Sequence, residues 1–135
     1  MLLMNAKYIQ NVFKRGHMKL AIIGSRKLKI DDISKYLPYS AEKISEIVSG
    51  GAFGVDRSAG EYAKRNKIKL TEFLPDYKRY GRAAPIKRNE LIASYADEAV
   101  AIWDGKSKGT LHTVRLFCSL NKKVTLINCG AEKEI

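Results

Sequence analysis

The sequence predicts an α/β fold in which helices cover both faces of a mostly parallel, five-stranded sheet. Short apolar runs, the length of buried strands, alternate along the 135 residues with segments of helical periodicity. Such alternation implies right-handed crossovers between parallel strands. Glycine-bearing turns follow three of the apolar runs directly. We expect the strand order 3-2-1-4-5, which makes the protein a Rossmann-like three-layer sandwich.

Five apolar runs are expected as strands. Gly24 follows the first run, Gly50 and Gly51 follow the second, and Pro75 stops the third. The five runs lie at residues 20–23, 44–48, 68–74, 99–103 and 124–127.

The first helix is expected between the first two strands, where Asp31 or Asp32 can cap it. Its apolar residues share one face, and a proline ends it. These residues are Ile33, Tyr36, Leu37 and Pro38.

Three further helices follow the second, third and fourth strands. The first of them has its apolar residues at the i, i+4, i+8 spacing of a helix buried against a sheet. The second has a proline in its first turn and runs to about Tyr95, and the third presents one apolar face. The residues concerned are Val55, Ala59 and Ala63, then Pro85, then Leu111, Val114 and Cys118.

The segment before Pro85 shows no periodicity. It spans residues 76–84, and its residues Tyr77, Tyr80 and Gly81 suggest a functional loop.

The composition, with 45% apolar and 29% charged residues, is that of one globular domain with a proper core. We expect this domain at residues 18–130, with an extension at 1–17 that need not belong to it and a tail at 131–135. The apolar runs are too short to cross a membrane, and no secretion signal is recognisable. We therefore expect a cytoplasmic protein without a membrane partner.

The cysteines and histidines do not suggest a metal centre. Cys118 and Cys129 belong to no paired motif, and we expect small buried apolar groups rather than a disulfide. His17 and His112 are too few and too scattered for zinc. We expect neither a metal nor a cofactor.

The formal net charge of +11 is concentrated between Lys64 and Arg88 and would attract polyanions. A solvated lysine-rich face is the favoured interpretation, because no nucleic-acid motif accompanies the charge. A nucleic-acid surface is the alternative. The basic residues are Lys64, Arg65, Lys67, Lys69, Lys78, Arg79, Arg82, Lys87 and Arg88.

The glycine-bearing turns point to a phosphorylated ligand. Glycine lets the backbone approach a ligand closely, and a helix that follows a turn presents free N–H groups to anions. In the expected strand order these turns meet at the switch point between strands one and four, where ligands bind. We expect phosphate to contact Gly24, Ser25, Arg26, Gly50, Gly51, Ser107, Gly109 and Thr110. We expect the ribose or base to contact Asp56, Trp103 and Asp104, and Ser49, Asn89 and Gly105 complete the ligand-binding set.

Several of these residues also have a plain structural interpretation. Asp56 can cap a helix, and Ser107 can do the same. Trp103 can pack at the sheet edge, Asp104 can shape a turn, and Arg26 can be an exposed turn arginine.

Arg88 and Asn89 begin a helix after the expected functional loop. If they face the crevice, Arg88 would be a phosphate or transition-state clamp, with Asn89 as its hydrogen-bonding neighbour. The alternative is a solvated amphipathic helix.

Two common nucleotide sites are disfavoured. No G-x-G-x-x-G follows the first strand, and the second strand ends in glycines rather than in the ribose-binding acid of NAD dehydrogenases. Residues 105–110 combine two glycines, two hydroxyls and two lysines. They lack the Lys and Ser/Thr that follow the second glycine of a P-loop, so ATP hydrolysis loses its main support.

Four short motifs occur in order along the chain. They are G-S-R at 24–26, S-G-G-A-x-G-V-D at 49–56, A-A-P-x-x-R-N at 83–89 and W-D-G-x-S-x-G-T at 103–110. Together they resemble the SLOG superfamily, which groups the DNA-processing Smf proteins with the "Lonely Guy" nucleotide hydrolases. They are similar in particular to its small YspA-like branch. The resemblance covers nearly all of residues 19–127 and implies a Rossmann-like domain that binds a nucleotide or a nucleotide derivative.

In the Lonely Guy hydrolases, an arginine helix and a P-G-G-x-G-T-x-x-E-like motif remove the base from nucleoside monophosphates. The resemblance makes Arg88 the candidate for that catalytic arginine. This chain departs from the pattern, because His112 and Thr113 stand where glutamate is expected. The usual carboxylate is therefore missing, unless Asp56 or Asp104 takes its place.

Three functions stay open. The first is a sensor or carrier of a phosphorylated nucleotide ligand. The second is an N-glycosidic hydrolase of nucleoside 5′-monophosphates that uses Arg88 with an aspartate. The third is a single-stranded DNA binder that uses the basic surface between Lys64 and Arg88. A homodimer is also an open expectation, because members of the superfamily often pair.

Overall fold

The computed structural model describes residues 16–130, so the expectations for residues 1–15 and 131–135 lie outside the described residues. One sheet of five parallel strands has the order β3-β2-β1-β4-β5. This confirms the predicted α/β class, the Rossmann-like layering and the strand order. The strands are β1 (Met18–Gly24), β2 (Ile44–Ser49), β3 (Lys69–Glu72), β4 (Glu98–Trp103) and β5 (Val124–Asn128).

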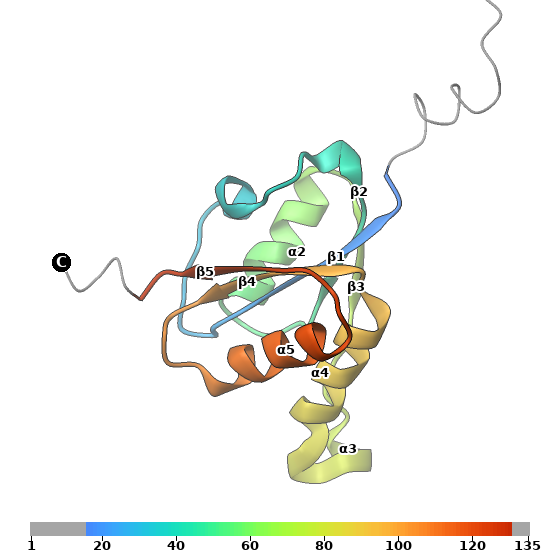
Figure 1. Cartoon of the computed structure of the whole chain (residues 1–135), viewed down its shortest axis with the longest axis vertical. Helices are drawn as coiled ribbons and strands as arrows, with labels where there is room; N and C mark the ends of the chain where they lie inside the picture. Colours follow the sequence, from blue (N-terminus) through green and yellow to red (C-terminus); the bar gives the residue numbers. More distant parts are fainter. Residues whose placement is uncertain (1–15, 131–135) are drawn as a thin grey trace, which may run out of the picture.

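Helical segments lie on both faces of the sheet (Figure 1). One face carries α2 (Val55–Arg65) together with the 3-10 turns η1 (Ile33–Tyr36) and η2 (Ala41–Lys43). The other face carries α4 (Ala84–Tyr95) and α5 (Lys108–Ser119), which pack against each other. The short α3 (Tyr77–Tyr80) and the 3-10 turn η3 (Gly81–Ala83) lead into α4 and project away from the sheet (Figure 1).

Alternating side chains along the strands build a separate core on each face of the sheet. Toward α2, the buried strand residues are large and branched, because one side of a parallel sheet packs against a single helix and the 3-10 turns. Toward α4 and α5, three of them are alanines, which leave room for two packed helices. The first set includes Leu20, Ile22, Ile47, Val100 and Ile102, and the second includes Ala21, Ile23, Val48, Ala99 and Ala101.

The helix expected after β1 is a single 3-10 turn, η1. Asp32 caps it as predicted, because its carboxylate accepts a hydrogen bond of 2.9 Å from the Ser34 amide. Leu37 is extended and precedes Pro38, and a residue before proline is biased away from the helical conformation. The cap and the proline therefore leave room for only one turn.

The segment expected to be a loop without periodicity contains α3 and η3. The Asp76 carboxylate accepts a hydrogen bond of 3.0 Å from the Arg79 amide and so starts α3. Gly81 ends it with a φ of +54°. A cap and a glycine five residues apart predict this turn better than periodicity does, because four residues are too few to show a period.

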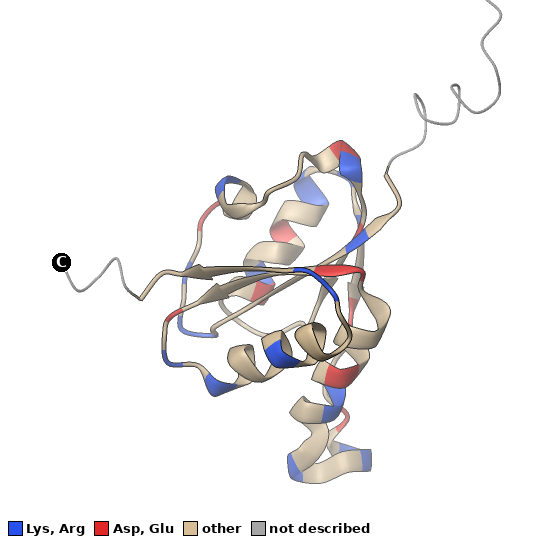
Figure 2. Ribbon diagram, viewed as in Figure 1, with Lys and Arg blue, Asp and Glu red and all other residues tan. Residues whose placement is uncertain are grey.

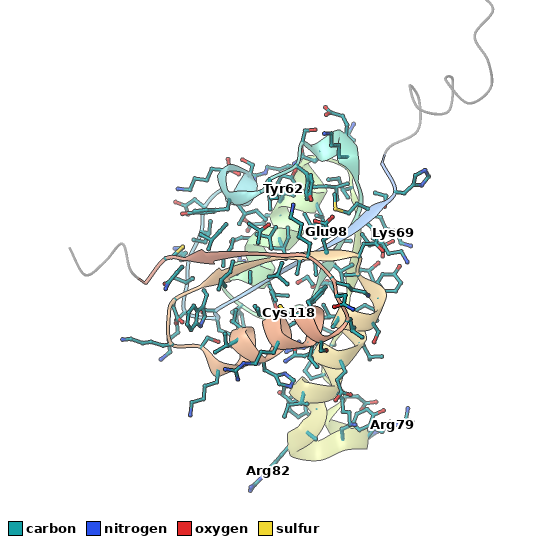
Figure 3. The ribbon with its side chains drawn as sticks, viewed as in Figure 1. Tyr62, Lys69, Arg79, Arg82, Glu98 and Cys118 are labelled. Carbon is teal, nitrogen blue, oxygen red and sulfur yellow. The ribbon has the colours of Figure 1, made fainter. Side chains whose placement is uncertain are left out.

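The buried face of α5 differs from the predicted one. Thr110, Thr113 and Phe117 are buried, whereas Cys118 is exposed. The expectation that both cysteines are buried is therefore wrong for Cys118, which Figure 3 labels on α5, and right for Cys129. The predicted face was wrong because it was derived from apolar residues alone, and the threonines were counted as polar. Their hydroxyls bond within the first turns of the helix, so the rest of each side chain can face the sheet.

The basic residues between Lys64 and Arg88 do not form one surface. Lys64, Lys67 and Lys69 lie where α2 ends and β3 begins, and Arg79 and Arg82 lie beyond the end of β3. Figure 2 shows basic residues at both of these places, and Figure 3 shows Lys69 far from Arg79 and Arg82. These basic residues therefore fall into two separate groups, and a nucleic-acid partner stays a prediction.

A bilayer-spanning segment is not found in residues 16–130, where every helix is too short or too polar for that role.

Replacing Phe117 with alanine should lower the free energy of unfolding by about 3–5 kcal/mol, because the ring is fully buried between α5 and the sheet. Cys118→Ala on the neighbouring, exposed position is the matched control and should change it by less than about 0.5 kcal/mol. Urea denaturation of both variants measures the difference. A larger loss for Cys118→Ala would contradict the observed face of α5.

Candidate functional site

A cleft of about 910 Å³ lies at the carboxyl ends of β1 and β4, at the switch point of the sheet. It collects residues from turns that are far apart in the sequence. The predicted site residues that line it are Gly24, Ser25, Arg26, Gly50, Asp56, Arg88, Asn89, Asp104, Gly105, Ser107, Gly109 and Thr110. Ser49, Gly51 and Trp103 do not line it.

The turn after β1 packs closely against its neighbours. A side chain on Gly24 would collide with the carbonyl oxygen of Ile102 and with Val55, so only glycine fits between β4 and α2. Ser25 is buried, and its hydroxyl oxygen accepts a hydrogen bond of 3.3 Å from the Asp104 amide. Arg26 is exposed at the cleft. Of the two side chains, Arg26 is thus the one that can reach a ligand freely, while Ser25 holds two turns together.

The turn after β4 is shaped by its own side chains. Asp104 Oδ1 accepts hydrogen bonds of 2.8 Å from the amides of Lys106 and Ser107, and these bonds lower the pKa of Asp104. The Ser107 hydroxyl accepts 3.3 Å and 3.0 Å hydrogen bonds from the amide and the hydroxyl of Thr110 and caps α5. For Asp104 and Ser107, the structural interpretation given above is therefore observed.

The first turn of α5 leaves two backbone donors without an intrahelical acceptor, and one of them, the amide of Gly109, belongs to a residue that lines the cleft. The amides of Lys108 and Gly109 precede the first residue that the helix can satisfy, because an α-helical N–H bonds four residues back. Gly109 lines the cleft, and no atom lies within 4 Å of where its Cβ would be. An anion can approach the helix end here without meeting a side chain.

Trp103 braces the same loop from outside the cleft. Its indole Nε1 donates a hydrogen bond of 2.9 Å to the carbonyl of Ser107. The ring therefore packs on the loop that leads into α5, and its position offers no base a stacking surface inside the cleft.

The turn after β2 contributes Gly50 to the cleft, and neighbouring side chains fix the shape of this turn. The Ser49 hydroxyl is buried and accepts a hydrogen bond of 3.2 Å from the Gly51 amide. A Cβ on Gly50 would lie 2.6 Å from Nη1 of Arg88 and 3.1 Å from Oδ2 of Asp56. Gly50 is thus required because two charged side chains occupy the space that a Cβ would need.

Arg88 is buried to 9% exposure and is held by fixed partners. Its Nη1 donates a hydrogen bond of 2.7 Å to the carbonyl of Gly50, and its Nε donates one of 2.9 Å to Oδ1 of Asn89. Burial lowers the pKa of Arg88, and the nearby Asp56 opposes that shift. The prediction that Arg88 and Asn89 face the crevice as hydrogen-bonding neighbours agrees with this geometry, while their action on a ligand stays a prediction.

Asp56 lies in the cleft at 8% exposure. Its Oδ2 accepts a hydrogen bond of 3.0 Å from the Ala52 amide. Burial raises its pKa to about 6, against the opposing effects of this hydrogen bond, Arg88 and Arg26. Since the folded protein holds this proton more tightly than the unfolded chain does, the contribution of Asp56 to stability falls as the pH rises from 3.8 to about 6.

Four polar cleft residues lie outside the predicted set: Lys27, Lys106, Thr113 and Asn128. Lys27 follows the G-S-R motif directly, and Lys106 lies inside the glycine-rich loop, so motif neighbourhood could have found both. Asn128 ends β5, and the rule that ligands bind at carboxyl ends of strands could have found it.

A metal-binding group of three or more His, Cys, Asp or Glu side chains is not found in the described part of the chain.

The pKa of Asp56 should rise further above 6 in Arg88→Gln, because the nearby positive charge that favours its ionised form is lost. The carboxyl ¹³C chemical shift of Asp56, followed by NMR against pH, measures this. Arg79→Gln, on exposed α3, is the control and should leave the titration unchanged. A wild-type midpoint near the ordinary 3.8 would contradict the buried site.

Comparison with family models finds one match: residues 18–80 match the model of the family described as "YspA, cpYpsA-related SLOG family". The matched range contains the turns at 24–26 and 49–56. No curated protein matches the chain. No solved structure matches it either. Over residues 18–80, the family match confirms the predicted resemblance to the YspA-like branch of the SLOG superfamily.

Proposed function

We propose that this protein binds a nucleotide or a nucleotide-derived phosphorylated ligand in the cleft between β1 and β4, as a sensor or carrier. The observation that carries the proposal is that cationic side chains and the unbonded amide of Gly109 line the same cleft. The match of residues 18–80 to a SLOG family model independently suggests a nucleotide-related ligand.

The anion-binding end of this cleft combines two kinds of donor. The amides of Lys108 and Gly109 are free of intrahelical acceptors and stand at the positive end of the α5 dipole. Arg26, Lys27 and Lys106 line the same cleft with positive side chains. Asp104 brings a negative charge nearby, but one of its oxygens is already bonded to two backbone amides. The local charge therefore favours a phosphate group.

The volume suits a ligand larger than a bare phosphate ion. Pockets for small molecules and cofactors span roughly 300–1,000 Å³, and this cleft, at about 910 Å³, lies near the upper end of that range. A nucleoside with its phosphate fits such a space, with its remainder extending from the α5 end toward Asp56 and Arg88.

N-glycosidic hydrolysis of nucleoside 5′-monophosphates is a second candidate, and one observation favours it. Asp56 and Arg88 both lie close to Gly50 in the same cleft, and the pKa of Asp56 is raised to about 6. A carboxyl group with such a pKa in a cleft can exchange protons at physiological pH. Asp56 would then supply the carboxylate that is missing after Gly109 and Thr110.

Adding AMP, ADP-ribose, NAD or cyclic AMP in turn should raise the melting temperature with at least one of them, while adenosine should raise it much less, because it lacks the phosphate. Arg26→Ala should weaken the binding of the stabilising nucleotide by roughly 10- to 100-fold, as expected for a lost charge-assisted hydrogen bond. Thermal shift and isothermal titration calorimetry measure the two effects.

The matched control is Arg115→Ala, which removes an exposed arginine that does not line the cleft and should leave the affinity unchanged. A melting temperature that none of these nucleotides raises would contradict nucleotide binding. Chromatography of the incubated AMP separates the two candidates: intact nucleotide supports a sensor or carrier, and free adenine supports the hydrolase.

A further inference from the structure

The three residues expected to contact ribose or base differ in which polar atoms they leave free for a ligand. Trp103 uses its indole N–H on the Ser107 carbonyl and lies outside the cleft. Asp104 uses Oδ1 on two backbone amides that fix its own loop. Asp104 Oδ2 is not used by these bonds, but of the two aspartates only Asp56 lies beside Arg88, since Asp56 and Arg88 both approach Gly50. The following inference rests on the proposed nucleotide binding.

Asp56 and Arg88, which both lie next to Gly50, each keep one polar atom without a hydrogen-bond partner in the described residues. Oδ2 of Asp56 bonds to the Ala52 amide, while Oδ1 has no hydrogen-bond partner among residues 16–130. Arg88 uses Nε and Nη1 on Asn89 and Gly50, and its Nη2 has no acceptor in the same described range. Both residues are at most 9% exposed, and both line the cleft. Solvent or a ligand can therefore reach them through the cleft.

A vicinal diol satisfies such a pair. Its two hydroxyls can both donate to an ionised carboxylate, which only accepts, and its oxygens can accept from a guanidinium, which only donates. An ionised Asp56 would repel a phosphate bound next to it, and Arg88 and Arg26 would offset part of that repulsion, whereas a neutral diol meets no repulsion there. In a nucleoside 5′-phosphate, the diol and the phosphate stand on opposite sides of the ribose. The cleft likewise combines an unbonded amide, at Gly109 of α5, with a carboxyl group, at Asp56 of α2, and these could bind the phosphate and the diol respectively.

We propose that Asp56, supported by Arg88, forms a ribose subsite that binds the 2′,3′-diol and makes the cleft selective for ribonucleotides over 2′-deoxyribonucleotides. The selectivity has a physical source. A 2′-deoxy ligand removes one donor and leaves a buried carboxylate oxygen unpaired, which costs more than the loss of an exposed contact.

Calorimetric titration of AMP, 2′-deoxy-AMP and inorganic phosphate into wild type and Asp56→Asn tests the proposal. Wild type should bind AMP about 10- to 100-fold more tightly than 2′-deoxy-AMP. In Asp56→Asn that ratio should fall to about 3 or less, while phosphate binds as well as before or better, because a negative charge has left the cleft. A purely structural role of Asp56 would weaken all three ligands together. Asp31→Asn makes the same chemical change on an exposed residue outside the cleft and should keep the wild-type ratio.

The wild-type protein supplies a second readout if Asp56→Asn fails to fold. The charged groups that face Asp56 are Arg88, Arg26 and Glu72. Because the pKa of Asp56 is about 6, its carboxyl group is mostly neutral at pH 5 and accepts more weakly. The AMP to 2′-deoxy-AMP affinity ratio should therefore fall from pH 8 to pH 5. The titration of the phosphate itself cancels, since both ligands carry the same phosphate.

The outcomes separate the two proposals. Equal affinities for AMP and 2′-deoxy-AMP in wild type overturn the ribose subsite and leave nucleotide binding standing. A strong ribonucleotide preference that survives in Asp56→Asn also overturns it, because another residue must then bind the diol. Failure of wild type to bind either nucleotide overturns the proposed function and the subsite together.

Discussion

The turn at Gly24 and Ser25 is the point on which the arrangement of the cleft depends. Ser25 is buried, and each of its polar groups is used: its amide donates to the Ile102 carbonyl, and its carbonyl accepts from Leu28 and, at 3.5 Å, from Val55. Its hydroxyl oxygen accepts from Asp104. One residue thus fastens the end of β1 to the end of β4 and to the start of α2. The packing of Gly24 against Ile102 and Val55 allows this approach, because no larger residue fits there.

Charged groups of both signs line the cleft. The unbonded amide at the start of α5 and the positive side chains favour an anion. Arg88 and Asp56 both lie next to Gly50 and influence each other's pKa. Burial raises the pKa of Asp56 more than the two arginines lower it. Asp56 therefore titrates near pH 6 in a cleft that is otherwise lined mainly by basic side chains.

The sequence was sufficient for the fold because the strands are nearly continuous apolar runs and each turn carries a glycine, a proline or a cap. The convergence of the turns could also be predicted from the sequence, since parallel strands place all their carboxyl ends on one edge of the sheet. The sequence was insufficient where a side chain had two uses. Asp104 and Ser107 are suitable both for binding ligand and for shaping a turn, and only the observed hydrogen bonds distinguish these roles. Trp103 and the buried face of α5 depend on tertiary packing, which local periodicity does not encode.

Titration of the ¹⁵N-labelled protein with inorganic pyrophosphate, followed by amide chemical shifts, tests most directly whether turns distant in sequence bind one anion together. The amides of Gly24, Arg26, Lys108 and Gly109 should shift together and give one shared dissociation constant. Shifts scattered over the lysines of α2 and α3, or a separate constant for each turn, would contradict a shared anion site.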